Sequence, residues 1–549
     1  MAYDLLIKDA LVIDGSGMPA YTAAVAIQAG RIAAIGGIQG PARRTIRAEG
    51  MVLAPGFIDQ HTHMDAHLLW DPVALPLPEH GVTTVITGNC GLSLMPARPG
   101  DESAVIGTFA RVEAIPRSLL EGLDWRWSST KEYLDALEER PGVNVACMVG
   151  HNAIRQYVMG EDSTEREATL DEVESMCGLL RRAMQEGAIG YSINRNPTHF
   201  RDDGKPLPSR LASADELLRV AGVLSEFDIG LIQQSSMRNR DFSDIDMAAR
   251  LANASSRPVI WSGVSFRTQT PDFHRKQLAH VQRYFEQGLR LYGNTNIVPF
   301  AVRFNLKDGQ FLDDLPTFRT LPREQRARQI TAASFRATLR AEMSPDFARR
   351  IAGLKIVLTK DTVLQGKTLA EAAGIRSAAD PFDLMLDLSA AEGLETLFLF
   401  SEPIADEMGK IACSPYTIVG QSDAGAHVQF LSNFGVCTAL LGHYVRERRL
   451  LSLEEAVRQL TFKVASIFGI RDRGLIWPGW AADLVLFDPD TVGPCDAEEA
   501  NDYPGGFCRV IQHARGVHYT IVNGEVLIEN GTHTGAYPGR VLRQAAAGA

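Results

Sequence analysis

Gly56-Phe57-Ile58-Asp59-Gln60-His61-Thr62-His63 is the stretch that decides the fold. Its first three residues complete a short apolar run over residues 52–58. This run predicts a buried β-strand, and polar residues follow at its end. Because His61 and His63 are two positions apart, both imidazoles leave the same side of an extended chain. One cation can then bind both side chains, although such a pair can also be solvated on a surface.

The composition is that of an ordinary globular protein. Of the 549 residues, 45% are hydrophobic and 22% are charged, and this length predicts one large domain with at least one smaller unit. The net charge of -11, without a long basic run, argues against nucleic-acid binding. No segment reaches about 18 consecutive apolar residues, so we expect no membrane-spanning helix and no membrane partner.

The N-terminus and the cysteines indicate a cytoplasmic protein. Asp4 and Asp9 interrupt the segment where a secretory signal would have a basic start and an apolar core. The seven cysteines are scattered along the chain without a CxxC pair. This pattern predicts reduced thiols and no structural zinc knuckle.

Three regions differ in their hydrophobic patterning. Residues 57–470 alternate between apolar strands and helical stretches, and about eight strand candidates predict an α/β fold, a (β/α)8 TIM barrel with an insertion near residues 300–350. An open doubly wound sheet is the competing architecture, but no GxGxxG turn follows the first strand. Residues 1–56 and 471–549 show strands separated by Gly and Asn turns, which predict one small β-sandwich formed by both termini.

Polar residues stand at the ends of the predicted barrel strands, where the active site of such a barrel lies. His61, His63, Cys90 and Asp423 are proper ligands for a borderline metal such as zinc. Asp423 is also the candidate catalytic residue, because it can take a proton from a metal-activated water and pass it to a leaving amine. The alternatives are a helix-capping role for Asp423 and a buried hydrophobic role for Cys90.

Four further residues are candidates for substrate binding. They are Asn89, His151, Gln234 and Arg195. For His151, which lies in a Gly-His-Asn sequence, a satisfied loop residue is an equally good interpretation.

The ordered motifs resemble the amidohydrolase superfamily, and within it the D-aminoacylase (N-acyl-D-amino-acid deacylase) group. The motifs are residues 56–63, His80-Gly81-Val82-Thr83-Thr84-Val85 leading to Gly88-Asn89-Cys90-Gly91, Ser422-Asp423-Ala424-Gly425, and residues 479–485. The resemblance covers nearly the whole chain. It implies a (β/α)8 barrel with a β-sandwich from both termini, a small-molecule substrate, and one or two Zn2+ ions or another divalent metal.

The metal ligands of that group are matched only in part. His61, His63, Cys90 and Asp423 match, but the histidines that end the fourth and fifth strands do not. Gln233-Gln234 and Ser262-Gly263 occupy those places, and no lysine is placed to act as a carbamylated bridging ligand. Because Gln is a poor zinc ligand and Gly has no side chain, those two positions cannot hold a metal as in the group.

The residues that bind the substrate carboxylate in that group are also replaced. Ser265 stands in place of the lysine, and the segment 430–435 lacks the expected arginine. Arg195, Arg238 and Arg303 are unassigned candidates for the same task.

The leading hypothesis is a metal-dependent amidohydrolase that cleaves the amide bond of a small N-acyl compound. Metal-bound hydroxide would attack the acyl carbon, with Asp423 as general base and then acid. The alternatives are hydrolysis of an ester, lactone or cyclic amide at the same site, and a metal-poor binding subunit without activity. A homo-oligomer is a further expectation, because a barrel of this size often buries an insertion against a partner subunit.

Overall fold

The computed structural model describes residues 2–235, 241–267, 270–298, 301–307, 311–378, 380–401, 405–428 and 433–543. The chain forms two compact units. The first comprises Met1–Val298, Ala405–Val428 and Ser432–Ala549, and the second comprises Pro299–Ile404 and Gln429–Leu431. The insertion predicted near residues 300–350 falls within the second unit.

Parallel strands close into a barrel in the first unit. In spatial order they are β6 (Phe57–Asp59), β7 (Val82–Thr87), β8 (Asn144–Cys147) with its continuation β9 (Val149–Gly150), β10 (Tyr191–Ile193), β11 (Ile232–Gln234), β12 (Val259–Ser262), β13 (Leu291–Asn294) and β17 (Thr417–Ile418). Strand β8 pairs with β7, and β9 pairs with β10. The ring closes where His61 forms a parallel bridge with Gln421.

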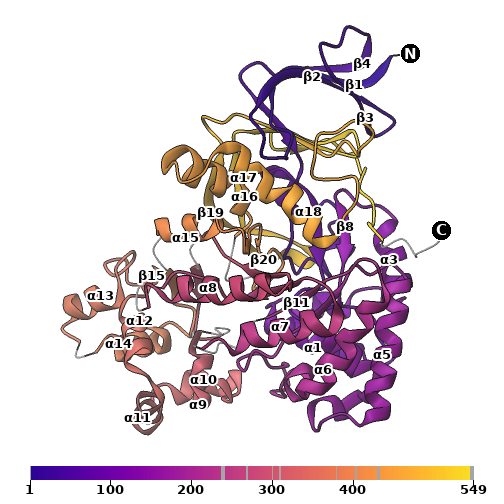
Figure 1. Ribbon diagram of the computed structural model, residues 1–549. Coiled ribbons are helices and arrows are strands. Elements are labelled where there is room, and N and C mark those ends of the chain that lie inside the picture. The colour runs from indigo at the N-terminus through magenta and orange to yellow at the C-terminus, as the bar shows by residue number, and fades with distance from the viewer. Residues whose placement is uncertain are drawn as a thin grey trace. The chain divides into compact units, whose positions relative to one another are not determined.

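Helices follow most of the barrel strands and cover them (Figure 1). They are α1 (Glu102–Val112), α2 (Arg117–Glu121), α3 (Thr130–Glu138), α4 (His151–Met159), α5 (Leu170–Gln185), α6 (Ala214–Gly222), α7 (Ser243–Ser255), α8 (Phe273–Glu286), α15 (Asp406–Ala412), α16 (Val436–Ala439), α17 (Leu453–Leu460) and α18 (Phe462–Phe468). Helix α5 shows why they form: Thr169 and Glu172 make a capping box at its start, which contributes about 1 kcal/mol. Its apolar face, including Val173, Met176 and Leu180, is buried.

Both termini contribute to one β domain in the first unit. Its nine-stranded sheet contains β1 (Tyr3–Val12), β2 (Tyr21–Gln28), β3 (Arg31–Gly36), β4 (Ala42–Arg47), β5 (Val52–Pro55), β18 (Leu484–Phe487), β21 (Val517–Val522), β22 (Glu525–Glu529) and β23 (Thr532–His533). The two ends of the chain meet where β5 pairs with β18. This sheet has its own hydrophobic core, which includes Leu5, Val25 and Leu484. The boundaries at residues 56 and 470 stay a prediction.

A long hairpin accompanies the β domain. It consists of β19 (Gly493–Tyr503) and β20 (Phe507–Arg515).

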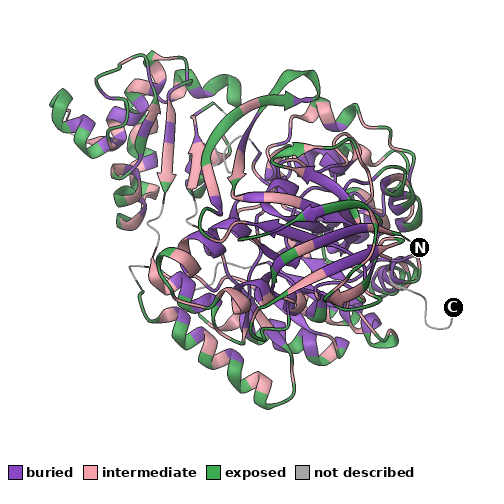
Figure 2. Ribbon diagram, turned by 90° about the horizontal axis from the view of Figure 1, so that it is seen from above, coloured by how far each residue is buried: buried purple, intermediate pink, exposed green. Residues whose placement is uncertain are grey.

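The buried residues gather in the strands of the first unit, and exposed residues lie mainly on the outer helices and loops (Figure 2).

The second unit is built around a small antiparallel sheet. Its strands are β14 (Ala301–Phe304), β16 (Leu397–Ser401) and β15 (Lys355–Leu358), in that order. Its helices are α9 (Pro316–Arg319), α10 (Arg323–Gln329), α11 (Ala333–Glu342), α12 (Pro345–Ala352), α13 (Leu369–Arg376) and α14 (Pro381–Ala391). Phe304, Phe311 and Phe398 form part of its core, with Phe304 stacked on Phe311 at a centroid distance of 4.6 Å.

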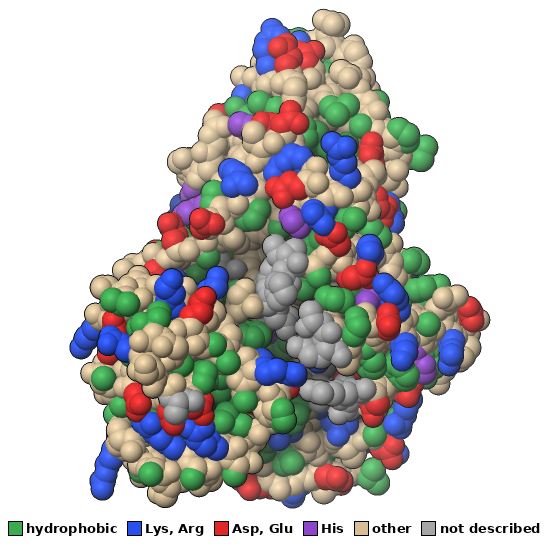
Figure 3. Space-filling model, turned by 90° about the vertical axis from the view of Figure 1, so that its left-hand side faces the viewer, with side chains coloured by type: hydrophobic (Ala, Val, Ile, Leu, Met, Phe, Trp, Pro, Cys, Tyr) green, Lys and Arg blue, Asp and Glu red, His purple; other side chains and the backbone are tan. Residues whose placement is uncertain are grey.

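The surface mixes charges of both signs. On the face shown in Figure 3, Lys and Arg side chains alternate with Asp and Glu side chains over the described part of the chain. None of the helices in the described ranges is long and apolar enough to cross a membrane.

Asp483 joins the β domain to the barrel. Its carboxylate accepts hydrogen bonds from Asn144 Nδ2 at 2.9 Å and from the backbone N–H of Asn523 at 2.7 Å, and it contacts the buried guanidinium of Arg473. Its backbone carbonyl accepts from Gly56 N at 2.8 Å, immediately before β6. The Asp483 side chain thus connects β8 with the C-terminal strands, and its backbone carbonyl binds the start of the barrel.

We expect the Asp483→Ala variant to lose about 3–5 kcal/mol of unfolding free energy, because it leaves the charge of Arg473 buried without its partner. Urea unfolding followed by tryptophan fluorescence measures the change. The control is Glu529→Ala, which removes the half-exposed ion pair with Arg44 and is expected to change stability by less than about 1 kcal/mol. An equal effect of both substitutions would contradict this role of Asp483.

Candidate metal centre

The two histidines of the opening motif lie just beyond the end of β6. Backbone bonds from the loop after β17 fix this segment: the His63 N–H donates to the Ala424 carbonyl at 2.7 Å, and the Asp423 N–H donates to the His61 carbonyl at 3.1 Å. The two imidazole rings are 5.4 Å apart between centroids and both are buried. The extended backbone therefore presents both rings to one place, as the spacing predicts.

Cys90 reaches the same place from the end of β7. Its φ of 53° lies in the left-handed region, and its backbone N–H donates to Gln233 Oε1 at 2.8 Å. Its Sγ lies 3.3 Å from His61 Nε2. The ligand atoms of His61, His63 and Cys90 all lie within 4.8 Å of one another, the only such group among the described residues.

Asp423 completes the group from the loop after β17. It also has a left-handed φ, 55°, and its Oδ1 lies 3.2 Å from His61 Nε2 and 3.7 Å from His63 Nε2. Its side chain is 23% exposed, whereas those of His61 and His63 are at most 3% exposed. Asp423 is therefore more exposed to solvent than either histidine.

The donor set fits one borderline divalent metal. Burial lowers the pKa of His61 and of His63 to about 3, so both imidazoles are neutral and able to ligate. Burial, together with the charge of Asp423, raises the pKa of the Cys90 thiol well above its usual value. A bound cation favours the thiolate. Two imidazole nitrogens, one thiolate and one carboxylate oxygen match the ligands that zinc takes in proteins.

Residues that sequence reasoning did not assign surround these ligands. Glu113, the C-terminal cap residue of α1, places its Oε1 3.4 Å from His63 Nδ1. The Asn294 amide at the end of β13 lies 3.4 Å from His61 Nδ1 and accepts a hydrogen bond from Gln60 Nε2 at 2.9 Å. Gln233 Oε1 accepts a hydrogen bond from the Cys90 backbone N–H. Their contacts join residues far apart in the chain, so no local spacing indicates them.

The four residues predicted to bind substrate occupy different surroundings. Asn89 is buried beside Cys90, and its Nδ2 donates to the carbonyls of Thr62 and Ile86 at 3.3 and 3.0 Å. Gln234 turns toward α7, where its Nε2 donates to the Asp244 carbonyl at 3.0 Å. The structure therefore does not direct the Gln234 side chain to the metal-binding group.

His151 belongs to a second buried cluster. Its Nε2 lies 3.0 Å from Glu216 Oε1, and its Nδ1 lies 2.5 Å from the Tyr191 hydroxyl. Glu216 also accepts from Arg155 Nε at 2.9 Å. Burial lowers the pKa of His151, and these partners occupy both of its ring nitrogens. This arrangement matches the interpretation of His151 as a satisfied residue.

Arg195 follows β10 and is half-buried. The residue before it, Asn194, packs against Gly91, next to Cys90. Arg195 makes no hydrogen bond or ion pair with another residue in the described ranges. Arg238 and residues 430–432 lie outside the described residues.

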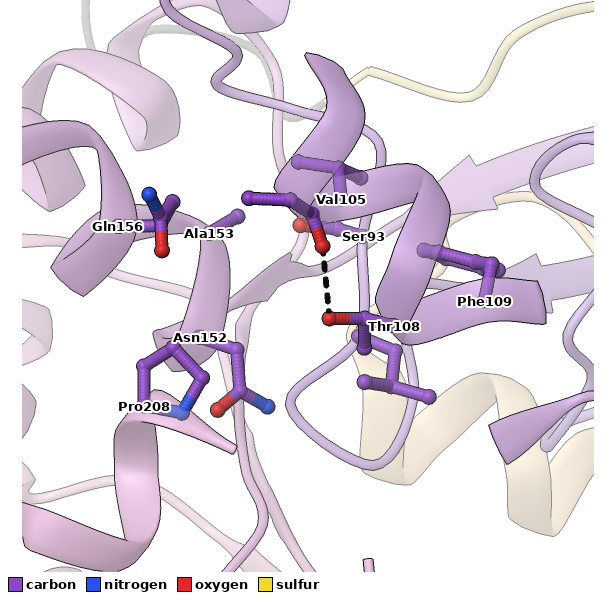
Figure 4. A pocket seen from close by; sticks show the side chains of 10 residues that line it. Ser93, Val105, Thr108, Phe109, Asn152, Ala153, Gln156 and Pro208 are labelled. Atoms are coloured by element: carbon purple, nitrogen blue, oxygen red, sulfur yellow. Dashed lines mark hydrogen bonds between the residues drawn. The ribbon is translucent and has the colours of Figure 1, made fainter. Parts of the chain in front are cut away.

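A separate small cavity lies between α1 and α4 (Figure 4). Its volume is about 20 Å3, which suffices for one water molecule, and Thr108, Asn152 and Gln156 are among its lining residues. The Asn152 and Gln156 oxygens already accept hydrogen bonds from Ser209 and Ser163. The cavity contains none of the candidate metal ligands.

Comparison with known proteins identifies the class to which this fold and site belong. The model of the amidohydrolase family matches residues 44–528, and the chain belongs to that family. Among its relatives is a D-aminoacylase of Alcaligenes xylosoxydans xylosoxydans, 30% identical over 99% of this chain and 98% of the relative. An N-acyl-D-aspartate deacylase of the same organism is 32% identical over 98% of this chain and 95% of the relative.

Solved structures agree with these relatives. An N-acyl-D-glutamate deacylase of Bordetella bronchiseptica, complexed with zinc and a phosphonate inhibitor, has a TM-score of 0.71 and 27% identity, covering 99% of this chain and 100% of that chain. A D-aminoacylase described as having a binuclear metal centre has a TM-score of 0.69 and 28% identity over the same shares. The predicted family, the α/β barrel fold and the class of metal-dependent hydrolase acting on carbon–nitrogen bonds other than peptide bonds are confirmed.

Gly425 allows the Asp423 loop to approach the histidine segment. It has a φ of +85°, and a Cβ atom there would clash with the carbonyl of His63. We expect Gly425→Ala to reduce bound metal at least about tenfold, because the clash separates the loop from the segment that carries His61 and His63.

Gly288→Ala is the matched control. Gly288 has the same φ of +85°, but nothing lies within 4 Å of the position that a Cβ atom would take there. Both variants therefore carry the same left-handed backbone strain, about 1–2 kcal/mol, and only Gly425→Ala carries the clash. Metal content and melting temperature are measured for both. Equal metal content in the two variants would contradict the proposed tight fit.

Proposed function

We propose that the protein deacylates N-acyl-D-amino acids or closely related small N-acyl compounds with one divalent metal. The protein itself is an amidohydrolase that acts on small molecules; the proposal concerns the substrate and the residues that act on it. His61, His63, Cys90 and Asp423 are the proposed ligands. The observation that carries the proposal is the convergence of His61, His63 and Cys90, whose ligand atoms lie within 4.8 Å of one another. The Asp423 carboxylate lies 3.2 Å and 3.7 Å from the two imidazoles.

One metal is proposed because the neighbouring strand ends offer no second set of ligands among the described residues. Gln233 Oε1 accepts the Cys90 N–H, and its Nε2 lies 3.3 Å from Ser262 Oγ, so both ends of this amide have protein partners. Asn294, at the end of β13, is likewise paired with Gln60. These positions supply hydrogen bonds where a second ion would need imidazoles or carboxylates.

When bound, the metal acidifies a water molecule and polarises the acyl carbonyl. Asp423 is more exposed than the two imidazoles, so its carboxylate can accept the proton of the attacking water and then give it to the leaving amine. His61 and His63 would hold the metal through their nitrogen lone pairs, and burial lowers the pKa of both, so neither imidazole is available to take that proton. These roles require that the Asp423 carboxylate is accessible to solvent and that the imidazoles of His61 and His63 are not.

Elemental analysis and turnover of the wild type, the His61→Ala/His63→Ala double variant and Asp423→Asn test this proposal together. We expect about one metal equivalent in the wild type and none in the double variant. Asp423→Asn should keep part of the metal and lose about 10²- to 10⁴-fold in kcat, the range of general acid–base catalysis. Asp423→Asn with unchanged kcat, or a wild type that takes up no metal even after supplementation, would refute the proposed mechanism.

Arg195 is the proposed anchor for the carboxylate of an N-acyl amino acid. It is half-buried, lies beyond the end of β10 directly after Asn194, which packs against Gly91, and has no hydrogen-bonding or ion-pairing partner among the described residues. Its guanidinium can therefore form a bidentate pair with a planar carboxylate. A substrate that is an ester, lactone or cyclic amide would not need this anchor.

We expect Arg195→Ala to raise KM for an N-acetyl-D-amino acid about 10- to 100-fold, consistent with loss of about 1.5–3 kcal/mol for a hydrogen bond to a charged group. KM for the corresponding uncharged N-acetyl amide should stay within about twofold. Arg210→Ala is the control, because Arg210 donates to the His199 carbonyl at 3.1 Å and lies over the Phe200 ring. If the carboxylate and the amide respond equally to Arg195→Ala, this role is excluded and the carboxylate-free substrates gain support.

A further inference from the structure

A buried carboxylate faces the back of one proposed metal ligand. Glu113 directly follows α1 as its C-terminal cap residue, and its side chain is 2% exposed. Its Oε1 lies 3.4 Å from His63 Nδ1, and its Oε2 has no hydrogen-bond partner among the described residues. Burying a carboxylate without full pairing is costly. The site therefore keeps an acidic group at a position where an apolar side chain would be easier to accommodate.

The backbone holds Glu113 against the loop that carries Asp423. The N–H of Val428, five residues after Asp423, donates to the Glu113 carbonyl at 3.1 Å, and the Glu113 N–H donates to Phe109 O at 3.0 Å. The next residue, Ala114, has a φ of 54°, so the chain turns sharply after Glu113. The Glu113 backbone is thus fixed by α1 on one side and by the Asp423 loop on the other.

The two nitrogens of His63 face different carboxylates. Nε2 lies 3.7 Å from Asp423 Oδ1, on the side of the other ligands, and Nδ1 lies 3.4 Å from Glu113 Oε1. A neutral imidazole that ligates through one nitrogen carries its proton on the other, and that N–H needs an acceptor. In this structure His63 Nδ1 makes no hydrogen bond to the described residues, and Glu113 Oε1, 3.4 Å away, is the acceptor that they place beside it.

We propose that Glu113 is a positioning residue for the metal centre: it accepts the Nδ1–H of His63 and so keeps the Nε2 lone pair directed at the metal. This inference rests on the metal site proposed above. It assigns Glu113 no contact with the substrate. The corresponding neighbour of His61 is the neutral amide of Asn294, so the carboxylate supports only one of the two imidazoles.

Two substitutions of similar size distinguish the role of Glu113 as a hydrogen-bond acceptor from its role in filling space. Glu113→Gln keeps a carbonyl oxygen that can accept from Nδ1–H, whereas Glu113→Leu fills the space without an acceptor. We expect Leu to weaken Co2+ binding about 10- to 100-fold, as is typical for loss of a metal ligand's outer partner, and Gln to weaken it less than about tenfold. Co2+ affinity is measured on metal-free protein by chelator competition and by the thiolate-to-cobalt absorption of Cys90.

Glu79→Gln is the matched control. Glu79 is also a buried carboxylate beside an imidazole, with its Oε2 2.7 Å from His513 Nδ1, but His513 is not a proposed ligand. Its Co2+ affinity should equal that of the wild type. The melting temperature of each metal-free variant shows whether it folds, and the Leu variant is expected to fold because it replaces an incompletely paired buried polar group.

A cycle with His63→Ala tests whether the effect passes through His63. Glu113→Leu should not weaken Co2+ binding further in the His63→Ala background. Wild-type affinity in folded Glu113→Leu, or an equal loss in both backgrounds, would overturn the proposal while leaving the metal site intact. A wild type that binds no Co2+ would instead refute the metal site itself.

Discussion

Closure of the barrel between its first and last strands is the constraint on which the site depends. The chain segment after β6 is held to the segment after β17 by backbone hydrogen bonds from His63 to Ala424 and from Asp423 to His61. Asp59 adds to this junction, because its Oδ1 lies 3.3 Å from the backbone nitrogens of both His61 and Ser422. These contacts join residues about 360 positions apart, and they set the distance between the imidazoles and the carboxylate.

The junction has an electrostatic consequence. Burial raises the pKa of Asp59 and of Asp65 to about 7 and raises that of Glu113 well above its usual value, while it lowers those of the histidines. Burial therefore favours the uncharged forms of all these groups. A divalent cation bound at the centre would favour the charged carboxylates and keep the imidazoles neutral.

The sequence predicts the barrel and the proposed ligands because each ligand directly follows a strand. His61 and His63 depend on the alternation of an extended chain, and Cys90 and Asp423 depend on the rule that parallel strands end at one face of a barrel. The direction of the Gln234 side chain depends on which residues of a three-residue strand point to which side of the sheet, and composition does not determine this. In the structure Gln233 faces the Cys90 backbone, and Gln234 faces α7. Glu113 and Asn294 could not be predicted, because only tertiary packing brings them to the histidines. His151 is the first residue of α4 and not a loop residue, and its imidazole is paired with Glu216 and Tyr191.

A crystal structure of the zinc-loaded protein, with anomalous data collected at the zinc edge, tests the central claim most directly. We expect one anomalous peak at the centre, about 2.0–2.2 Å from nitrogen or oxygen atoms of His61, His63 and Asp423 and about 2.3 Å from Cys90 Sγ. Gln233 should still accept the Cys90 N–H. Two peaks at the centre, or one metal ion bound to Gln233 and not to the His61 and His63 imidazoles, would contradict the proposed site with a single metal.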